Sequence, residues 1–209
     1  TMWRTNGPLF EHLKLKPKAQ PEGSFSNSKT VPFRDGRFMH VIPIQRHVIP
    51  RMVGTTSAMS FPYVWMNVGG VDIAMLMDTG TSNIIVPQRD EPNQYVQCDK
   101  YDDECWKQFR LYARNASSHS QVLSLENELI PMEDVRADRP SLLMTFGTRN
   151  VSVFNARDVV CLVPHVCREM NFLPISDVDS ESLRKYSFDG VLGLGLNKLA
   201  YSYTISDRF

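Results

Sequence analysis

The chain has 209 residues and carries 23 lysines and arginines against 23 aspartates and glutamates, a formal net charge of zero. This length allows one sizeable core or two small ones, and the even balance argues against a dedicated nucleic-acid binder. The charges are unevenly spread, because residues 1–55 hold nine bases and three acids, which leaves 14 bases and 20 acids for residues 56–209.

Residues 1–55 form a basic leader of net charge +6 ahead of a body of net charge −6. The leader is rich in Pro, Lys, Ser and Asn, and only Phe38–Val48 comes close to a periodic pattern. Thr1–Leu15 lacks the continuous apolar region of a secretory signal, and no apolar run in the chain is long enough to cross a bilayer. We therefore expect a poorly structured leader, for which a disordered basic tail is the simplest interpretation.

Two apolar runs, Val71–Met77 and Ile84–Val86, flank the sequence Asp-Thr-Gly-Thr-Ser-Asn at residues 78–83. Apolar runs of this length, bounded by turn residues, are typical of strands buried on both faces. The Gly-Gly pair at 69–70 predicts a short hairpin connection into the first run. The pattern therefore predicts a carboxylate, that of Asp78, at the turn between two buried strands.

Two segments further along the chain add to this pattern. Residues 188–195 read Phe-Asp-Gly-Val-Leu-Gly-Leu-Gly, an apolar strand pattern with regularly placed glycines. Residues 145–148 read Thr-Phe-Gly-Thr, and Asp158–Val160 follows them. Between the first motif and these segments, Val122–Pro140 has more acids than bases, which favours a solvated surface insertion.

These motifs together resemble the pepsin family of aspartic peptidases. The family's first active-site segment reads Asp-Thr-Gly-Ser/Thr-Ser-Asn, followed by apolar residues and often by Val-Pro, as at residues 78–87 here. The resemblance covers roughly residues 57–209 and corresponds to the amino-terminal lobe only. It implies a mostly β fold, an acid-protease half-barrel over residues 56–209 whose carboxyl-terminal lobe is missing. It also implies that strand 190–195 passes beside the turn, and that a flap hairpin at 145–148 returns through Asp158–Val160.

The chemistry that the resemblance implies is hydrolysis of peptide bonds by a water molecule held between two aspartates. Carboxyl groups at such short range share one proton, so one acts as a base and the other as an acid. Asp78 would be one of them, oriented by the Thr81 hydroxyl and the Gly80 amide, with Thr79 and Ser82 supporting the turn. A flap of Phe146, Gly147 and Thr148 would close over a polypeptide substrate. No cofactor or metal is implied.

The second aspartate is missing from this sequence, which contains a single Asp-Thr-Gly. Three explanations stay open. The chain is the amino-terminal lobe of a two-lobed enzyme whose other lobe carries the second aspartate, which is the interpretation we prefer. Alternatively, two copies of the chain each supply one aspartate, or the chain is a catalytically silent module that binds peptides or a protein.

The flap departs from the family pattern at two linked positions. A tyrosine is usual in place of Phe146, and its hydroxyl usually meets a tryptophan placed like Ile85. Losing one partner would leave a buried polar group unsatisfied, at a cost of about 1 to 3 kcal/mol, whereas replacing both by apolar groups is nearly neutral. Arg149 and Val153 also stand where the family commonly has glycine, so the expected results are a stiffer flap with altered specificity, or impaired catalysis.

The resemblance also implies a role for the basic leader, that of a prosegment. In the family, such a prosegment lies over the acidic cleft and is released in acid, when carboxylates protonate. Individual surface ion pairs are weak, so such a prosegment must be held in place by many charges together. We expect a zymogen whose prosegment ends between Arg46 and Ser57.

The four cysteines fall into two local pairs, Cys98 with Cys105 and Cys161 with Cys167. The family has a short disulfide loop near the first pair, and the second lies after the predicted flap. Local spacing, an even number and the resemblance favour disulfides over four reduced thiols. The spacings do not suit a zinc site.

Two glycosylation sequons begin at Asn115 and Asn150. With the disulfides, they favour the secretory pathway and an extracellular or lysosome-like acidic compartment. Asn150 would lie at or beside the flap tip, where a glycan would obstruct substrate entry, so either this sequon is unused or the flap works differently.

Overall fold

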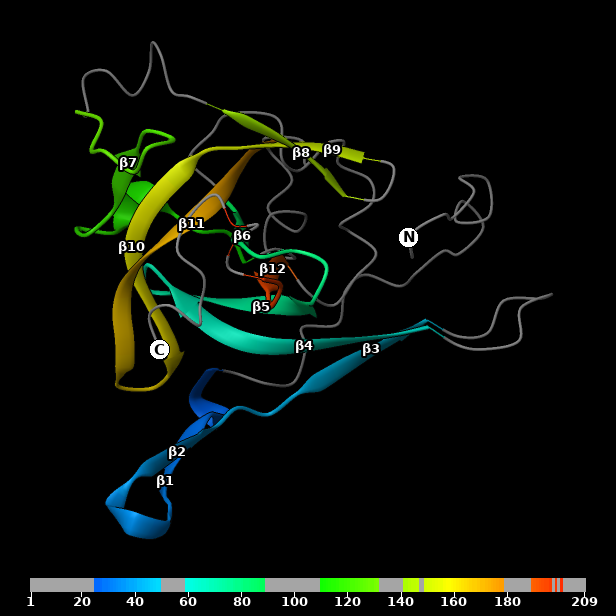
Figure 1. The fold of residues 1–209 in the computed structure, drawn as a ribbon, viewed down its shortest axis with the longest axis vertical. Helices are drawn as coiled ribbons and strands as arrows, with labels where there is room; N and C mark the ends of the chain where they lie inside the picture. The colour runs from blue at the N-terminus through cyan, green and yellow to red at the C-terminus, as the bar shows by residue number, and fades with distance from the viewer. Residues whose placement is uncertain are drawn as a thin grey trace, which may run out of the picture.

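The computed structural model describes residues 25–49, 59–88, 110–131, 141–146, 149–178, 189–196, 198 and 200. The fold of these residues is mostly β, as predicted, with three short 3-10 turns (Figure 1). The strands are β1 (Lys29–Pro32), β2 (Phe38–Val41), β3 (Gln45–Ile49), β4 (Met59–Val68), β5 (Val71–Asp78), β6 (Ile84–Pro87), β7 (Gln121–Leu123), β8 (Leu142–Phe146), β9 (Arg149–Val153), β10 (Asn155–Val163), β11 (Val166–Val178) and β12 (Gly190–Gly193). The 3-10 turns are η2 (Phe25–Asn27), η3 (Arg34–Gly36) and η4 (Arg114–Ala116).

Six strands close into a barrel, in the order β10, β4, β5, β12, β6 and β11, because β11 also pairs with β10. Two of these contacts are parallel, β5 with β12 and β6 with β11, and the others are antiparallel. Because the barrel is closed, each of the six strands pairs with a neighbour on both sides. The hairpin of β8 and β9 extends the sheet from β11, while β3 and β7 lie alongside β4 and β10.

The period-two alternation of side chains sorts the apolar residues onto the two faces of the barrel wall. Val64, Met66 and Val68 of β4 join one core cluster with residues from all the other barrel strands, so that cluster fills the interior. The intervening Tyr63 and Trp65 join a separate cluster on the outer face. In β6, Ile84 and Val86 belong to the interior cluster and Ile85 to a third cluster beneath β9, so this strand is buried on both faces, as predicted.

The Gly-Gly pair forms the predicted hairpin turn between β4 and β5, with Val68 opposite Val71. Gly69 and Gly70 have φ of 56° and 85°, values that side chains other than glycine disfavour. A Cβ atom on Gly69 would also lie 2.5 Å from Cε2 of Tyr112 and 2.7 Å from Oδ2 of Asp158. Glycine at 69 is therefore required by the backbone and by close packing alike.

Asp158, which the sequence placed only on a flap strand, is a buried carboxylate that ties residues 112–117 to the barrel. It accepts hydrogen bonds from the Tyr112 hydroxyl at 2.9 Å, the Ser117 hydroxyl at 2.9 Å and the Val159 backbone amide at 2.7 Å. These donors satisfy the carboxyl oxygens, whose burial without partners would be costly. The signal in the sequence for this buried carboxylate was a single aspartate among the mostly apolar residues of β10.

The expectation of a poorly structured leader is wrong for residues 25–49. β3 pairs with β4 along five positions, from Gln45 opposite Tyr63 to Ile49 opposite Met59, and Phe25 of η2 packs against the outer cluster of β4 and β5. The Tyr63 hydroxyl donates a 2.6 Å hydrogen bond to Oε1 of Gln45. Part of the leader is thus built into the sheet, while the proposed boundary at residue 55 lies outside the described residues.

The contribution of Tyr63 to the stability of the β3–β4 contact depends on pH in the alkaline range. Its pKa is raised above 10.0, first by burial and then by the nearby charge of Asp189, so the fold favours the neutral phenol. The stabilisation is complete below pH 10.0 and is lost as pH rises through the raised pKa. Replacing Tyr63 by Phe should cost about 1 kcal/mol at neutral pH, through the lost bond to Gln45. Urea unfolding should show this difference shrinking above pH about 10, and a constant difference up to pH about 12 would contradict the prediction.

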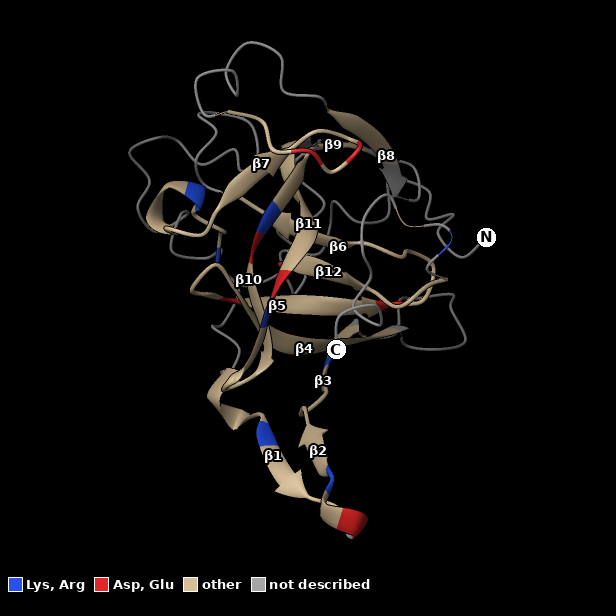
Figure 2. Ribbon diagram, turned by 60° about the vertical axis from the view of Figure 1, so that its left-hand side comes forward, with Lys and Arg blue, Asp and Glu red and all other residues tan. Residues whose placement is uncertain are grey.

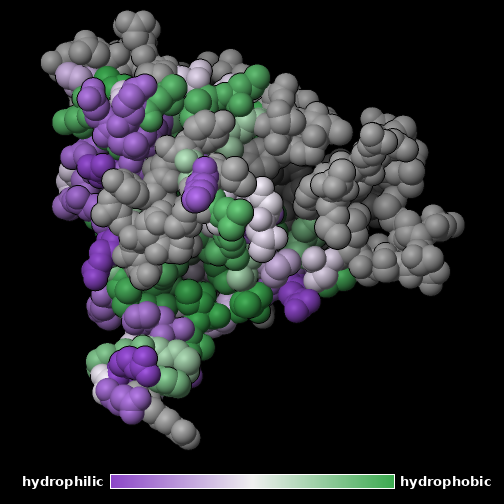
Figure 3. Space-filling view, viewed as in Figure 1, coloured by the Kyte–Doolittle hydropathy of each residue, from purple (hydrophilic) through white to green (hydrophobic). Residues whose placement is uncertain are grey.

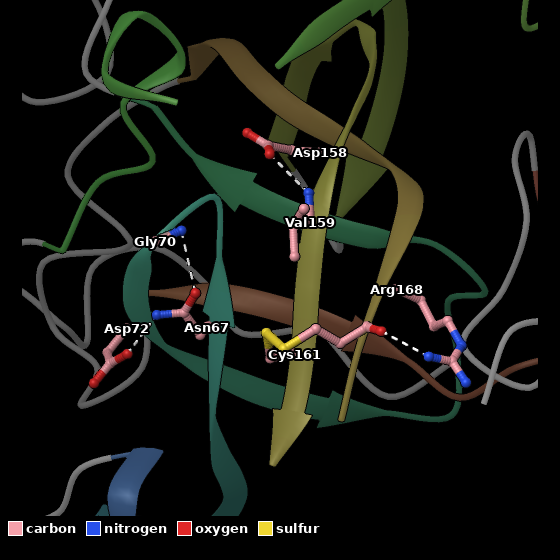
Figure 4. Close-up of a disulfide and its surroundings, with 8 residues drawn as sticks. Asn67, Gly70, Asp72, Asp158, Val159, Cys161 and Arg168 are labelled. Atoms are coloured by element: carbon pink, nitrogen blue, oxygen red, sulfur yellow. Dashed lines mark hydrogen bonds between the residues drawn. A yellow bond between two sulfur atoms is a disulfide. The ribbon is translucent and has the colours of Figure 1, made fainter. Parts of the chain in front are cut away.

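Cys161 and Cys167 form a disulfide, as predicted. The two residues face each other across the hairpin of β10 and β11, where the Cys167 carbonyl accepts a 3.0 Å hydrogen bond from Nη1 of Arg168 (Figure 4). Cys98 and Cys105 lie outside the described residues. A disulfide is compatible with a secreted protein.

Replacing both Cys161 and Cys167 by Ala should lower the free energy of unfolding by about 2 kcal/mol, the loop-entropy value for so short a loop. The measurement is denaturant unfolding of both proteins without reductant. Adding reductant should remove the difference between the two proteins, because neither then holds the Cys161–Cys167 bond. Equal stability of the two proteins under oxidising conditions would refute the assigned role.

Two further sequence interpretations need correction. The return strand of the predicted flap is β9, whereas Asp158–Val160 lies in barrel strand β10. The supposed surface insertion Val122–Pro140 begins within the fold, because Val122 and Leu123 of β7 are almost completely buried and Val122 lies opposite Ala156 of β10. Residues 132–140 of this segment lie outside the described part of the chain.

Candidate functional site

The turn at residues 78–83 lies at the carboxyl end of β5, where the chain leaves the core. Residues 73–75 of β5 are fully buried, Asp78 is half-buried, and Thr79 and Gly80 are exposed. The chain then returns to the interior through Ser82 and Asn83, both buried, and enters β6. This local pattern lifts one carboxylate to the surface between two buried strands.

β12 lies between β5 and β6 and holds this turn in place. Gly193 is opposite Asp78 in the parallel pairing with β5, and Leu192 is opposite Ile84 in the antiparallel pairing with β6. The sequence expectation that this apolar-glycine strand passes beside the turn is confirmed.

Backbone hydrogen bonds continue beyond the strand pairing. The amide of Leu194 donates to the carbonyl oxygen of Asp78 at 2.8 Å, and the amide of Gly195 donates to that of Thr81 at 2.8 Å. The amide of Gly193 donates to the carbonyl oxygen of Asn83 at 3.1 Å. Three consecutive amides thus bind the start, middle and end of the turn, which we call the β12 clamp (residues 193–195 on residues 78–83).

The glycines of β12 are explained by this close approach. A Cβ atom on Gly193 would lie 2.5 Å from both the nitrogen and the oxygen of the Asn83 backbone, and one on Gly195 would lie 2.7 Å from the Thr81 carbonyl oxygen. One on Gly190 would lie 2.6 Å from the sulfur of Met75 and 2.7 Å from the carbonyl oxygen of Ile85. Contacts this short do not occur with real side chains, so glycine is sterically required at 193 and 195 in the clamp, and at 190 where β12 passes Met75 and Ile85.

The Asp78 carboxylate receives one hydrogen bond from its own turn, because the Gly80 amide donates to Oδ1 at 2.8 Å. The expected hydrogen bond from the Thr81 hydroxyl to Asp78 is not formed within the described residues. Thr81 contributes its backbone carbonyl to the β12 clamp instead. The half-buried carboxylate is therefore oriented by the backbone of its own turn.

β8 and β9 form the predicted hairpin, with Phe146 opposite Arg149 and Thr145 opposite Asn150. Gly147 and Thr148, which follow β8 in the sequence, lie outside the described residues. In Figures 1 and 2 this hairpin lies on the same side of the barrel as the carboxyl end of β5. The sequon at Asn150 is thus close to the hairpin tip, as expected, whereas Asn115 is exposed on η4.

Ile85 is buried in the apolar cluster under the hairpin. It shares this cluster with Val151 and Val153 of β9 and Leu173 of β11. An apolar residue here leaves no buried polar side-chain atom to be satisfied.

No protein-family model matches the chain, and no curated protein matches it closely enough to count as a relative. In the described part of the chain, no helix combines the length and the apolar character needed to cross a bilayer. Assignment of a function therefore depends on the turn, the β12 clamp and the hairpin alone.

Proposed function

We propose that the chain is the amino-terminal lobe of an aspartic-type endopeptidase and supplies Asp78 as one of its two catalytic aspartates. The observation that carries the proposal is the β12 clamp, which holds the turn of the half-buried Asp78 at the end of a buried strand. Catalytic groups need such preorganisation, because a displacement of about 1 Å costs about 100-fold in rate. The Gly80 amide adds a fixed orientation to the carboxylate.

The proposed reaction hydrolyses peptide bonds without a covalent intermediate. With a second carboxyl group beside it, Asp78 would share one proton with that group, since two like charges at short range do not both ionise. The ionised member takes a proton from the attacking water, and the protonated member donates to the scissile carbonyl oxygen. The hairpin of β8 and β9 supplies the flap that covers an extended polypeptide. The enzyme would act after export, in an extracellular or lysosome-like acidic compartment, once its basic prosegment is removed.

The second aspartate decides between the proposed enzyme and its alternatives. Reading the transcript past the codon for Phe209 should reveal another Asp-Thr-Gly or Asp-Ser-Gly followed by apolar residues. A stop codon before any such motif would exclude the two-lobed enzyme. Sedimentation would then separate a homodimer, which has twice the chain mass, from a monomer.

A catalytically silent peptide-binding module is the second candidate, favoured by the single Asp-Thr-Gly in the sequence. This candidate predicts that peptides bind but are not cleaved at any pH from strongly acidic to neutral. A library of fluorogenic peptides incubated with the complete product over this range tests it. Turnover that peaks in acid supports the peptidase, and binding without turnover supports the silent module.

A further inference from the structure

The hairpin of β1 and β2 projects away from the barrel (Figures 1 and 3). Among the described strands, β1 pairs only with β2, in a two-stranded sheet separate from the barrel sheet. A two-stranded hairpin on its own is marginally stable in water. Its stability therefore depends on what its side chains contact.

Large apolar side chains are concentrated on this hairpin and are exposed. Phe38 is 70% exposed, Phe33 49% and Met39 46%. With Ile44 and Val48 just beyond the hairpin, residues 33–48 hold half of the exposed large apolar side chains of the described chain. Figure 3 shows this end of the molecule as a mixture of hydrophobic and hydrophilic residues. Such a concentration marks an interaction surface.

The apolar residues lie on both faces of the hairpin. Pro32 is opposite Phe38, and the next pair, Val31 opposite Met39, points to the other face because side chains alternate along a strand. A groove on a protein partner would cover one face and leave the other in water. An inserted hairpin in a lipid headgroup region has both faces covered at once.

Positive charge accompanies the apolar residues. Residues 25–49 contain four bases and one acid, Asp35. Asp35 lies at the hairpin tip, 3.5 Å from Nη2 of Arg37 across an exposed contact, and the Arg37 guanidinium lies 5.9 Å from the centroid of the Phe33 ring. Figure 2 shows basic residues on β1 and next to the start of β2, where Lys29 and Arg37 lie in the sequence. Aromatic side chains with adjacent bases fit a surface that is apolar beneath and negatively charged at its boundary.

We propose that the β1–β2 hairpin binds an anionic lipid surface, with Phe33, Phe38 and Met39 inserted at the headgroup boundary and Lys29 and Arg37 against lipid phosphates or carboxylates. This binding does not involve Asp78. Because the hairpin belongs to the leader that the proposed peptidase loses on activation, the binding would place the unprocessed protein on a membrane surface.

The test is flotation of the 209-residue chain with vesicles of phosphatidylcholine alone or with about one third phosphatidylserine. We expect binding to the anionic vesicles only, and loss of binding between about 50 mM and about 500 mM salt. The double variant Phe33→Ser/Phe38→Ser should lose binding. Arg37→Gln should weaken it about fivefold, which corresponds to about 1 kcal/mol for one base near the surface.

Leu129→Ser is the matched control, because Leu129 is 62% exposed and lies outside the hairpin. This variant should bind like the parent. No binding to anionic vesicles, or binding that the hairpin variants leave unchanged, would overturn the proposal. Parent chains that self-associate through the hairpin in sedimentation, and do not float, would assign the surface to a second copy instead. If the double serine variant fails to fold by circular dichroism, Arg37→Gln and the salt dependence still decide the outcome.

Discussion

Replacing Asp78 by Asn should reduce the peptidase activity of the complete two-lobed enzyme by about 10⁴-fold, the scale seen when a member of a catalytic unit is removed. The amide has nearly the shape of the carboxylate and still accepts the hydrogen bond from the Gly80 amide, so the turn is retained. An amide neither shares a proton with the second aspartate nor takes one from water. The effect should therefore fall on kcat, with little change in KM, in initial-rate assays at acidic pH.

Asp72→Asn is the matched control on the same strand. Asp72 accepts a 2.8 Å hydrogen bond from Nδ2 of Asn67 near the opposite end of β5, and an asparagine oxygen keeps that bond. This variant should keep parental activity and stability. If Asp78→Asn retains turnover within a few fold of the parent, Asp78 is not the catalytic acid and the proposed function fails.

Replacing Gly193 by Ala should disrupt the turn that presents Asp78 and destabilise the barrel. The added methyl group would lie 2.5 Å from the Asn83 backbone, and backbone atoms move aside less easily than the end of a side chain. Overpacking of this kind costs about 3 kcal/mol. Because Gly193 is opposite Asp78, the displacement should also reduce activity well beyond the loss of folded protein.

Gly70→Ala separates this steric effect from the general cost of replacing glycine. Gly70 has φ of 85°, but a Cβ atom there would meet nothing within 4 Å. Its replacement should cost about 1 kcal/mol through backbone strain and leave the activity per folded molecule unchanged. Urea unfolding and active-site-normalised rates compare the two variants. Equal effects of Gly193→Ala and Gly70→Ala would contradict the proposed role of the clamp.

The position of β3 bears on how the leader would be removed. A cut between Arg46 and Ser57 would fall within or just after a strand that pairs with β4 and is bonded through Tyr63. Release of the leader would remove β3 from the edge of β4 and Phe25 from the outer cluster of Phe61, Tyr63 and Trp65. A proposed prosegment would therefore require another segment to cover this surface once it is gone.

Much of the barrel follows from local sequence patterns. The apolar runs flanking residues 78–83, the Gly-Gly turn at 69–70 and the apolar-glycine pattern at 190–195 each predict a strand or turn that the structure contains. These features are readable because burial of both faces demands unbroken apolar runs, and because positive φ demands glycine. The disulfide of Cys161 and Cys167 was also predictable, from its local spacing.

The sequence by itself determined that Asp78 lies on a turn between two buried strands. Only the tertiary structure decided what holds that turn: β12, more than 100 residues further along the chain, contacts it so closely that three backbone amides bind it and side chains are excluded. The same holds for the buried Asp158 and for the leader strand β3, whose partners Tyr112 and Tyr63 are distant in sequence. Local patterns report burial and backbone conformation, whereas contacts between distant segments depend on strand order and register, which composition and periodicity do not encode.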